Sequence, residues 1–347
     1  LFFFLRKLFL WLTPIILTLS ALIALFLGMS LSGKWGWLVL ASAGFGLLAG
    51  ANGMYQGIQD AARQRSIVAL HQGMIRWLQP LAAVGMVMLI GQSGSVAMLG
   101  FCIGTLVILI SQRFFVRRIF KDEFEKDKNQ QLISKTLLKY AYPFAIWGVV
   151  TWAQFSSDRW ALQTFLGERE VGLYAALFQL GNVPILLVTG LLNQLSTPII
   201  FEKIGDASDA NRVHSALWWI GVNVLIFGTF VLLVIAITWF MHDTLFRWAT
   251  AQDFWEVSFL LPLVCLGTGL FHLGQIFSIV GQAFNKVQVY IIPKVSVGVL
   301  AAGLNFILCS RFGLKGVIMT LIIVGISYAT WTGVLARKLI AEQLNII

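Results

Sequence analysis

Apolar stretches recur along the whole chain and are separated by short polar clusters. Each stretch is about 15–25 residues long, and roughly 20 apolar residues in a helix span the hydrocarbon core of a bilayer. Hydrophobic residues make up 58% of the chain and charged residues only 12%, whereas soluble domains carry about a quarter charged residues. Because a helix satisfies its own backbone groups, helices can cross lipid repeatedly. The sequence therefore predicts an all-α polytopic membrane protein.

Ten stretches qualify as transmembrane spans. They lie near Leu8–Gly28, Trp35–Met54, Leu78–Gln92, Ser95–Ser111, Tyr140–Ser157, Val171–Leu192, Leu217–Met241, Val257–Gly281, Ile291–Ser310 and Gly316–Ala336. The third stretch is short and can be extended back through Gly73. Between the fourth and fifth spans lies the longest charged segment of the chain, residues 113–139.

Basic residues are distributed unevenly between the polar connections. If the N-terminus is cytoplasmic, most Lys and Arg residues lie on the cytoplasmic side, as the positive-inside rule requires. The formal net charge of +10 then lies on that side, where it would also attract anionic lipid. We therefore expect both ends of the chain in the cytoplasm, and we do not expect nucleic acid to be a partner.

The three cysteines, Cys102, Cys265 and Cys309, all lie inside apolar stretches. This placement favours a packing role over a disulfide or metal framework, so we expect no metal and no cofactor. The chain begins at Leu1 instead of Met. We expect from this that an N-terminal segment is missing.

The segment from Tyr140 to Pro184 carries the most specific pattern. An apolar span ends in Ser157-Asp158-Arg159-Trp160, a polar bridge follows over Gly167–Tyr174, and a second apolar span begins at once. This arrangement resembles the middle of the polysaccharide or O-antigen flippases (Wzx-like) in the MATE-like multidrug/oligosaccharidyl-lipid/polysaccharide (MOP) exporter superfamily. Other stretches are similar to loops of that family: the polar run from Asn52 to Arg65, the turn Gly281–Lys286, and the turn within Asn305–Gly316.

The resemblance implies a fold and a division of the chain. Members have two helical bundles around a central cavity, with twelve or more helices in the whole protein. Residues 1–112 would be the remainder of the first bundle, with four spans and its N-terminal hairpin missing. Residues 113–139 would be a charged cytoplasmic connector, and residues 140–347 a complete second six-helix bundle.

The resemblance also implies a function. The chain would flip an undecaprenyl-diphosphate-linked oligosaccharide, the repeat unit of a polysaccharide or of lipopolysaccharide O-antigen, across the bacterial inner membrane by alternating access. Its implied partners are the lipid-linked oligosaccharide, membrane lipids, and a polysaccharide polymerase with other biosynthesis proteins. The alternatives are a MATE-type drug or toxin exporter and, from another class, a membrane polysaccharide polymerase or ligase. The short outer connections argue against the enzyme, and we expect none.

Ionisable residues inside a membrane are costly, so they are candidate functional residues by default. Asp158 and Arg159 are the best pair: Arg159 would attract phosphate or an acidic sugar at the outer mouth, and Asp158 would position it. The alternative is an interfacial charge pair that ends a span. Gln179 and Asn182 would bond sugar hydroxyls, or equally connect helices. Gln154 lies four residues before Asp158 and shares its helix face.

Basic residues near the cytoplasmic ends form the second set of candidates. Arg63, Arg65 and Arg76 would recognise a lipid diphosphate, because arginine matches phosphate with paired donors. Their alternative role is to set topology, and Lys286 and Lys294 carry the same two interpretations. His272 lies within a span, where it would titrate in a proton-coupled cycle or be a satisfied buried histidine.

Overall fold

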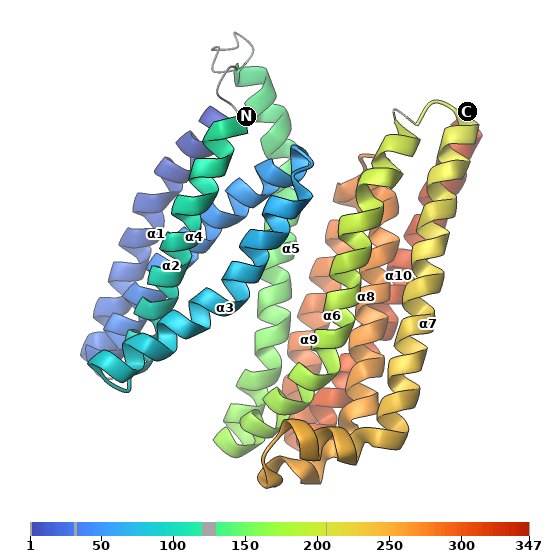
Figure 1. The fold of residues 1–347 in the computed structure, drawn as a ribbon. Helices are drawn as coiled ribbons and strands as arrows, with labels where there is room; N and C mark the ends of the chain where they lie inside the picture. Colours follow the sequence, from blue (N-terminus) through green and yellow to red (C-terminus); the bar gives the residue numbers. More distant parts are fainter. Residues whose placement is uncertain (1, 31–32, 120–129, 206, 347) are drawn as a thin grey trace. The chain divides into compact units, whose positions relative to one another are not determined.

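The computed structural model describes residues 2–30, 33–119, 130–205 and 207–346, all helical apart from short turns. The helices are α1 (Phe2–Ser30), α2 (Gly33–Ala61), α3 (Arg65–Ile90), α4 (Gly94–Ile119), α5 (Gln130–Phe165), α6 (Glu168–Ile204), α7 (Ala210–Ala249), α8 (Leu261–Ala283), α9 (Ile291–Phe312) and α10 (Leu314–Ile346), with 3-10 helices η1 (Gln252–Leu260) and η2 (Val287–Tyr290) (Figure 1).

Nine helical segments within the described ranges are long and apolar enough to cross a membrane. They correspond to every helix except α5, with η1 joined to α8 and η2 joined to α9. The sequence predicts ten spans, and its fifth, Tyr140–Ser157, lies inside α5. The side chains of residues 130–140 lie outside the described part of that helix.

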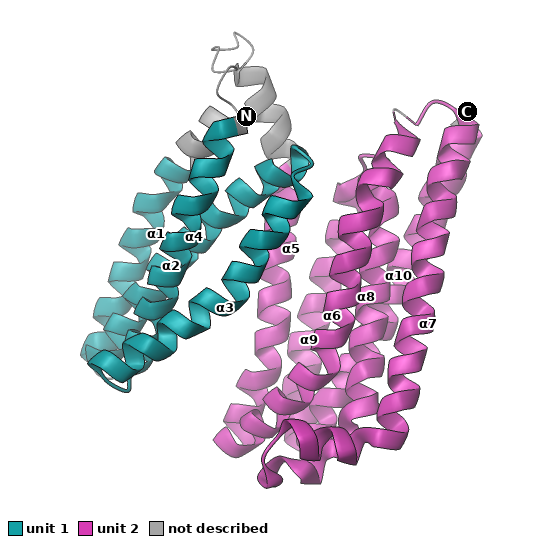
Figure 2. Cartoon of the chain, viewed as in Figure 1, with its two compact units in different colours: residues 1–137 teal, residues 138–347 magenta. Residues whose placement is uncertain are grey.

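The chain divides into two compact units, Leu1–Leu137 and Leu138–Ile347 (Figure 2). In unit 1, α2 packs against α1 and α4, and α4 also packs against α3. Two glycines allow α4 to approach α3 closely. A Cβ atom added at Gly100 would lie 2.4 Å from the Cα atom of Ala83, and one at Gly104 would lie 2.9 Å from that of Gln79. Small residues one turn apart are typical of tightly packed membrane helices.

In unit 2, α8 is the central helix, and it packs against α6, α7 and α10. In the most apolar part of the segment formed by η1 and α8, 72% of the residues are buried, compared with 22% in the most apolar part of α7. Glycines again permit the closest approach, since a Cβ atom at Gly325 of α10 would lie 2.6 Å from the carbonyl oxygen of Gly267 on α8. The larger of the two hydrophobic clusters of the described residues also lies in this unit.

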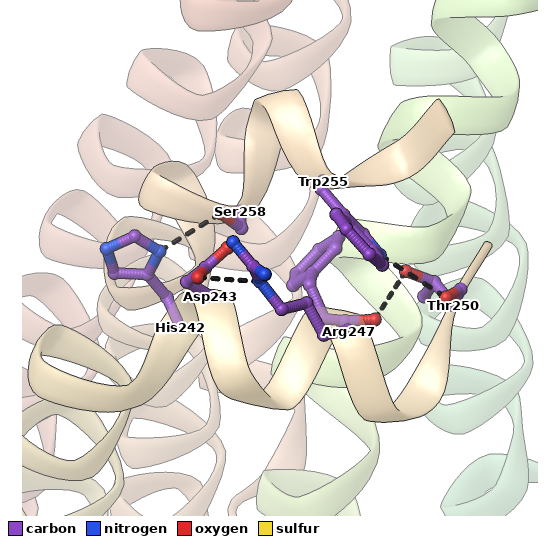
Figure 3. Close-up of polar contacts among 7 residues, drawn as sticks. His242, Asp243, Arg247, Thr250, Trp255 and Ser258 are labelled. Carbon is purple, nitrogen blue, oxygen red and sulfur yellow. Dashed lines mark hydrogen bonds and ion pairs between the residues drawn. The ribbon is translucent and has the colours of Figure 1, made fainter. Parts of the chain in front are cut away.

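The corner after α7 is held by polar contacts (Figure 3). The Arg247 guanidinium donates to the Asp243 carboxylate at 2.8 Å and lies 4.8 Å from the centroid of the Trp255 ring. His242 Nδ1 lies 3.0 Å from the Ser258 hydroxyl, which connects α7 to η1. The polar stretch His242–Glu256 is largely helical, because α7 continues to Ala249 and η1 begins at Gln252.

Two predicted loops are largely helical, and the connector is helical where it is described. Helix α5 continues past Ser157 to Phe165, and α6 begins at Glu168, so the polar bridge is only a turn at Leu166–Gly167. The polar run from Asn52 to Arg65 lies mostly in α2, where Asn52 and Gln59 are buried. Helix α3 begins at Arg65, so the third span is longer than Leu78–Gln92. The connector, residues 113–139, is helical at both ends, and residues 120–129 lie outside the described part.

Candidate functional site

Asp158 is a buried carboxylate in the interior of a helix. Its residue is 4% exposed, and α5 extends beyond it to Phe165. The hydroxyl of Tyr174 on α6 donates to Asp158 Oδ2 at 2.6 Å, and the backbone N–H of Arg159 approaches Oδ1 at 2.6 Å. A buried charge is tolerated only when such donors compensate its lost hydration. Asp158 is therefore part of the packed interior of unit 2.

A second set of polar groups joins α5 to α9 beside this carboxylate. Asn305 Nδ2 on α9 donates to the Ser157 hydroxyl at 2.9 Å, and that hydroxyl donates to the carbonyl oxygen of Gln154 at 2.8 Å. The side-chain oxygens of Gln154 and Asn305 are buried and have no hydrogen-bond partner in the described part of the chain. These two oxygens could therefore each accept a hydrogen bond or coordinate a cation.

A small cavity lies among these groups. It has a volume of about 10 Å³, and its lining includes Gln154, Asp158, Tyr174, Asn305 and Thr320. This volume is about the minimum that holds one water molecule. The unpartnered acceptors and the carboxylate are oxygen ligands, which suit a proton, a water molecule or a small hard cation. In the described ranges there is no group of three His, Cys, Asp or Glu side chains that could hold a metal ion.

A column of aromatic rings runs from this polar cluster into the unit. Tyr174 packs on Phe178 with centroids 5.7 Å apart. Phe155 contacts Phe178 at 5.6 Å and Phe271 at 5.3 Å, and Phe271 stacks on Tyr328 at 5.1 Å with an interplanar angle of 24°. The rings come from α5, α6, α8 and α10. We call these five residues the aromatic column.

A lysine ammonium lies at the other end of the aromatic column. Lys294 on α9 is 0% exposed, and its Nζ lies 4.2 Å from the Phe271 centroid and 5.1 Å from that of Tyr328. Within the described part of the chain, Nζ has no hydrogen-bond partner. His272 on α8 lies close enough to interact with it electrostatically, and the Tyr328 hydroxyl is also unpartnered. The Phe271 and Tyr328 rings supply cation–π contacts, and no hydrogen-bond acceptor among the described residues reaches Nζ.

The side chains of Arg159 and Asp158, the pair that the sequence singles out, contact different groups. The Arg159 Nη1 donates to the backbone oxygen of Phe155 at 3.3 Å, and its guanidinium lies 5.8 Å from the centroid of Phe178. Gln154 does share the cavity face with Asp158, as its spacing predicts. Asp158 lies about two turns before the end of α5 and is buried against α6, so the predicted alternative of a solvated charge that ends the helix does not describe its surroundings.

The other predicted site residues are dispersed. On α6, Gln179 is exposed, whereas Asn182 is half-buried with an unpartnered Oδ1. In unit 1, Arg63 lies in the α2–α3 turn and Arg65 begins α3. Arg76 is exposed about three turns further along α3. His272 is the exception, because it is 8% exposed and its ring lies 5.7 Å from that of Phe271, which Lys294 also contacts.

The sequence assigned Lys294 to the bases near the cytoplasmic ends, and it did not predict that this side chain is buried. Its position inside the apolar stretch Ile291–Ser310 was the available signal. Tyr174 and Tyr328 were not singled out, since a tyrosine in an apolar stretch gives no sign of its partner.

Solved structures with a similar fold are known. The chain superposes on a MATE transporter in the straight conformation with a TM-score of 0.71 and 18% identity, covering 98% of this chain and 78% of that one. It matches an outward-facing multidrug resistance MATE family transporter of the MOP superfamily at 0.65 and 17%, covering 96% and 78%. A MOP superfamily transporter from Pyrococcus furiosus, described as having a binding pocket of reversed polarity, matches at 0.68 and 16%, covering 95% and 78%.

No protein-family model matches the chain, and no curated protein does. The structural likeness shows the fold: the chain has the fold of the MATE transporters of the MOP superfamily. The predicted all-α, MATE-like fold is confirmed, and nine helical segments in the described part of the chain are long and apolar enough to cross a membrane. The likeness does not distinguish a polysaccharide flippase from a drug exporter.

Proposed function

We propose that this chain is part of a transporter that flips an undecaprenyl-diphosphate-linked oligosaccharide across the bacterial inner membrane. The observation that carries the proposal is Lys294, a buried lysine whose amine has no hydrogen-bond acceptor among the described residues of unit 2. Intramembrane ionisable groups without a structural partner mark substrate or ion pathways. Once protonated, this amine would attract an anionic substrate such as a diphosphate, whereas it would repel the cations that many drug exporters carry.

The chemistry of Lys294 supports a role that changes during transport. In this conformation the aromatic column holds the ammonium by cation–π contacts alone, which contribute about 2 kcal/mol or more when desolvated. A diphosphate oxygen would give a stronger, charge-assisted hydrogen bond. We propose that alternating access, by rocking of the two units as in transporters with repeated halves, exchanges the rings for the substrate anion.

The polar cluster around Asp158 would supply the coupling step. Asp158 and the unpartnered oxygens of Gln154 and Asn305 line one cavity, so they would bind a proton or a small cation. The ion would neutralise Asp158 and alter the contacts between α5, α6 and α9. Arg159, Gln179 and Asn182, with Arg63, Arg65 and Arg76 in unit 1, would contact the sugar and the diphosphate along the path.

The test is a translocation assay with the full-length protein in liposomes, using a fluorescent undecaprenyl-diphosphate oligosaccharide. We expect Lys294→Met to lower the flipping rate more than tenfold. Lys286→Met is the matched control, because Lys286 is partly exposed and its nearby acid is Glu342. Equal rates for both variants, or no movement of the lipid by the wild type, would exclude the proposal.

A MATE-type drug or toxin exporter is the second candidate, and one observation favours it. Asp158 is a buried carboxylate, a group that suits cationic compounds, and one similar structure is described as a multidrug resistance transporter. The two functions separate in one experiment. Efflux of a cationic dye that is lost in Asp158→Asn and kept in Lys294→Met, without oligosaccharide flipping, would establish the exporter instead.

A further inference from the structure

A second cavity lies in unit 2 and does not involve the polar cluster. It has a volume of about 560 Å³ and is lined by residues of α7, α8 and α10. Pockets that bind small molecules measure about 300–1,000 Å³. Neither Asp158 nor Lys294 lines it. We call it the α7–α10 cavity.

Glycines line the cavity on α7 and α10, where larger side chains would occupy the space. Helices α7 and α10 both pack against α8, which lies between them. Gly221 on α7 and Gly333 on α10 both line the cavity. A Cβ atom added at Gly221 would meet nothing within 4 Å. The space is therefore open for an occupant and is not closed by backbone.

The lining is apolar with one charge. Leu217, Val224, Phe277 and Val334 are typical of its side chains, and Thr330 and Arg337 are its two polar members. Arg337 is exposed. It forms no ion pair among the described residues, whereas the neighbouring Lys338 lies 4.0 Å from Glu342. A cavity with one free guanidinium and almost no hydrogen-bonding groups fits an alkyl chain with an anionic head.

The surroundings of Arg337 are basic. Lys286 and Lys338 share a single acid, Glu342. Near the end of α10, Gln343 Nε2 donates to the carbonyl oxygen of Ala207 at 3.0 Å, which brings the α6–α7 connection beside the C-terminal end (Figure 1). That connection carries acids as well as bases: it follows Glu202 and Lys203, contains Asp209 and precedes Arg212, so the lysines of α10 and of the turn after α8 are the bases that matter here. Clustered bases at the end of a membrane helix attract anionic headgroups.

We propose that the α7–α10 cavity binds one acyl chain of an anionic phospholipid, with the headgroup phosphate held by Arg337. A phospholipid of the bilayer fits better than a lipid-linked sugar. Apart from Arg337, Thr330 is the one lining residue whose side chain could form hydrogen bonds with sugar hydroxyls. The guanidinium presents paired donors that match two phosphate oxygens. This site is independent of the transported substrate, and its test does not require transport.

The test measures lipid retention by native mass spectrometry after reconstitution of the full-length protein in nanodiscs of equal phosphatidylglycerol and phosphatidylethanolamine. Arg337→Gln should lower the preference for phosphatidylglycerol about fivefold, because one basic residue near an anionic surface contributes on the order of 1 kcal/mol. Gly221→Leu should fill the cavity and lower retention of both lipids.

Each variant has a matched control. Lys338→Gln removes the neighbouring charge, which does not line the cavity. Gly228→Leu repeats the glycine change two turns along α7, where a Cβ atom also meets nothing within 4 Å. Both controls should retain lipid as the wild type does. Equal retention by all variants would overturn the proposal. In a parallel experiment, undecaprenyl diphosphate is added to the nanodiscs. If Gly221→Leu then loses bound undecaprenyl diphosphate but retains phosphatidylglycerol, the proposal is also overturned.

Discussion

The hydroxyl of Tyr174 on α6 donates a hydrogen bond of 2.6 Å to the carboxylate of Asp158 on α5. The tyrosine is 1% exposed and the aspartate 4%, so the bond replaces water that neither group can reach. The contact connects two helices that are adjacent in sequence, and it closes one side of the small polar cavity.

Removal of this hydroxyl should destabilise unit 2. Tyr174→Phe leaves the buried carboxylate short of a donor, which costs about 1–3 kcal/mol. In the background of Asp158→Asn, Tyr174→Phe should lower the free energy of unfolding by less, because a buried neutral amide loses less than a buried carboxylate when a hydrogen-bond donor is removed. Thermal unfolding of the two single variants and the double variant in detergent gives the coupling. Strictly additive losses would contradict a direct bond.

Gly100 should be intolerant of a methyl group. Gly100→Ala places a Cβ atom 2.4 Å from the Cα of Ala83, so α3 and α4 must separate, at a cost of about 1–3 kcal/mol. Gly85→Ala, on α3, meets nothing within 4 Å and should be neutral or slightly stabilising through helix propensity. The unfolding temperatures of the two variants check this, and a smaller loss for Gly100→Ala than for Gly85→Ala would refute the packing argument.

Much of the fold is readable from the sequence because apolar length is a local property. The positions where helices end depend instead on contacts with residues far away in the sequence. Asp158 ends an apolar stretch by hydropathy, yet α5 continues because Tyr174 and Asn305, from other helices, supply hydrogen bonds to this region. The hydropathy of the sequence shows where the charged residue is, but it contains no information about the residues of other helices that bond to it.

The same reason explains why the sequence did not predict the burial of Lys294. Its long apolar stem lets the residue enter a packed interior, and the rings that receive it, Phe271 and Tyr328, lie on α8 and α10. Spacing along α9 gives no sign of either ring. By contrast, the shared face of Gln154 and Asp158 follows from helix periodicity alone, and the cavity contains both.

Arg159→Ala should reduce flipping more than Arg169→Ala. Arg159 contacts the aromatic column and the Phe155 backbone. Arg169 forms a pair with Glu256, and both side chains are largely exposed, so the pair contributes about 0–1 kcal/mol. A complementation assay with matched expression levels compares them. Equal activity of the two variants would show that Arg159 has no special part in transport.

Lys294→Met should leave the fold as stable as the wild type, or make it more stable, while it lowers the flipping rate more than tenfold. A buried charge without an acceptor is costly, and well-packed apolar replacements of buried ions are often neutral or stabilising. Methionine keeps the length of the stem and contacts aromatic rings favourably. Unfolding temperature and flipping rate must therefore move independently. If Lys294→Met lowers both in parallel, the ammonium supports the structure through its cation–π contacts, and the case for an anion-binding lysine fails.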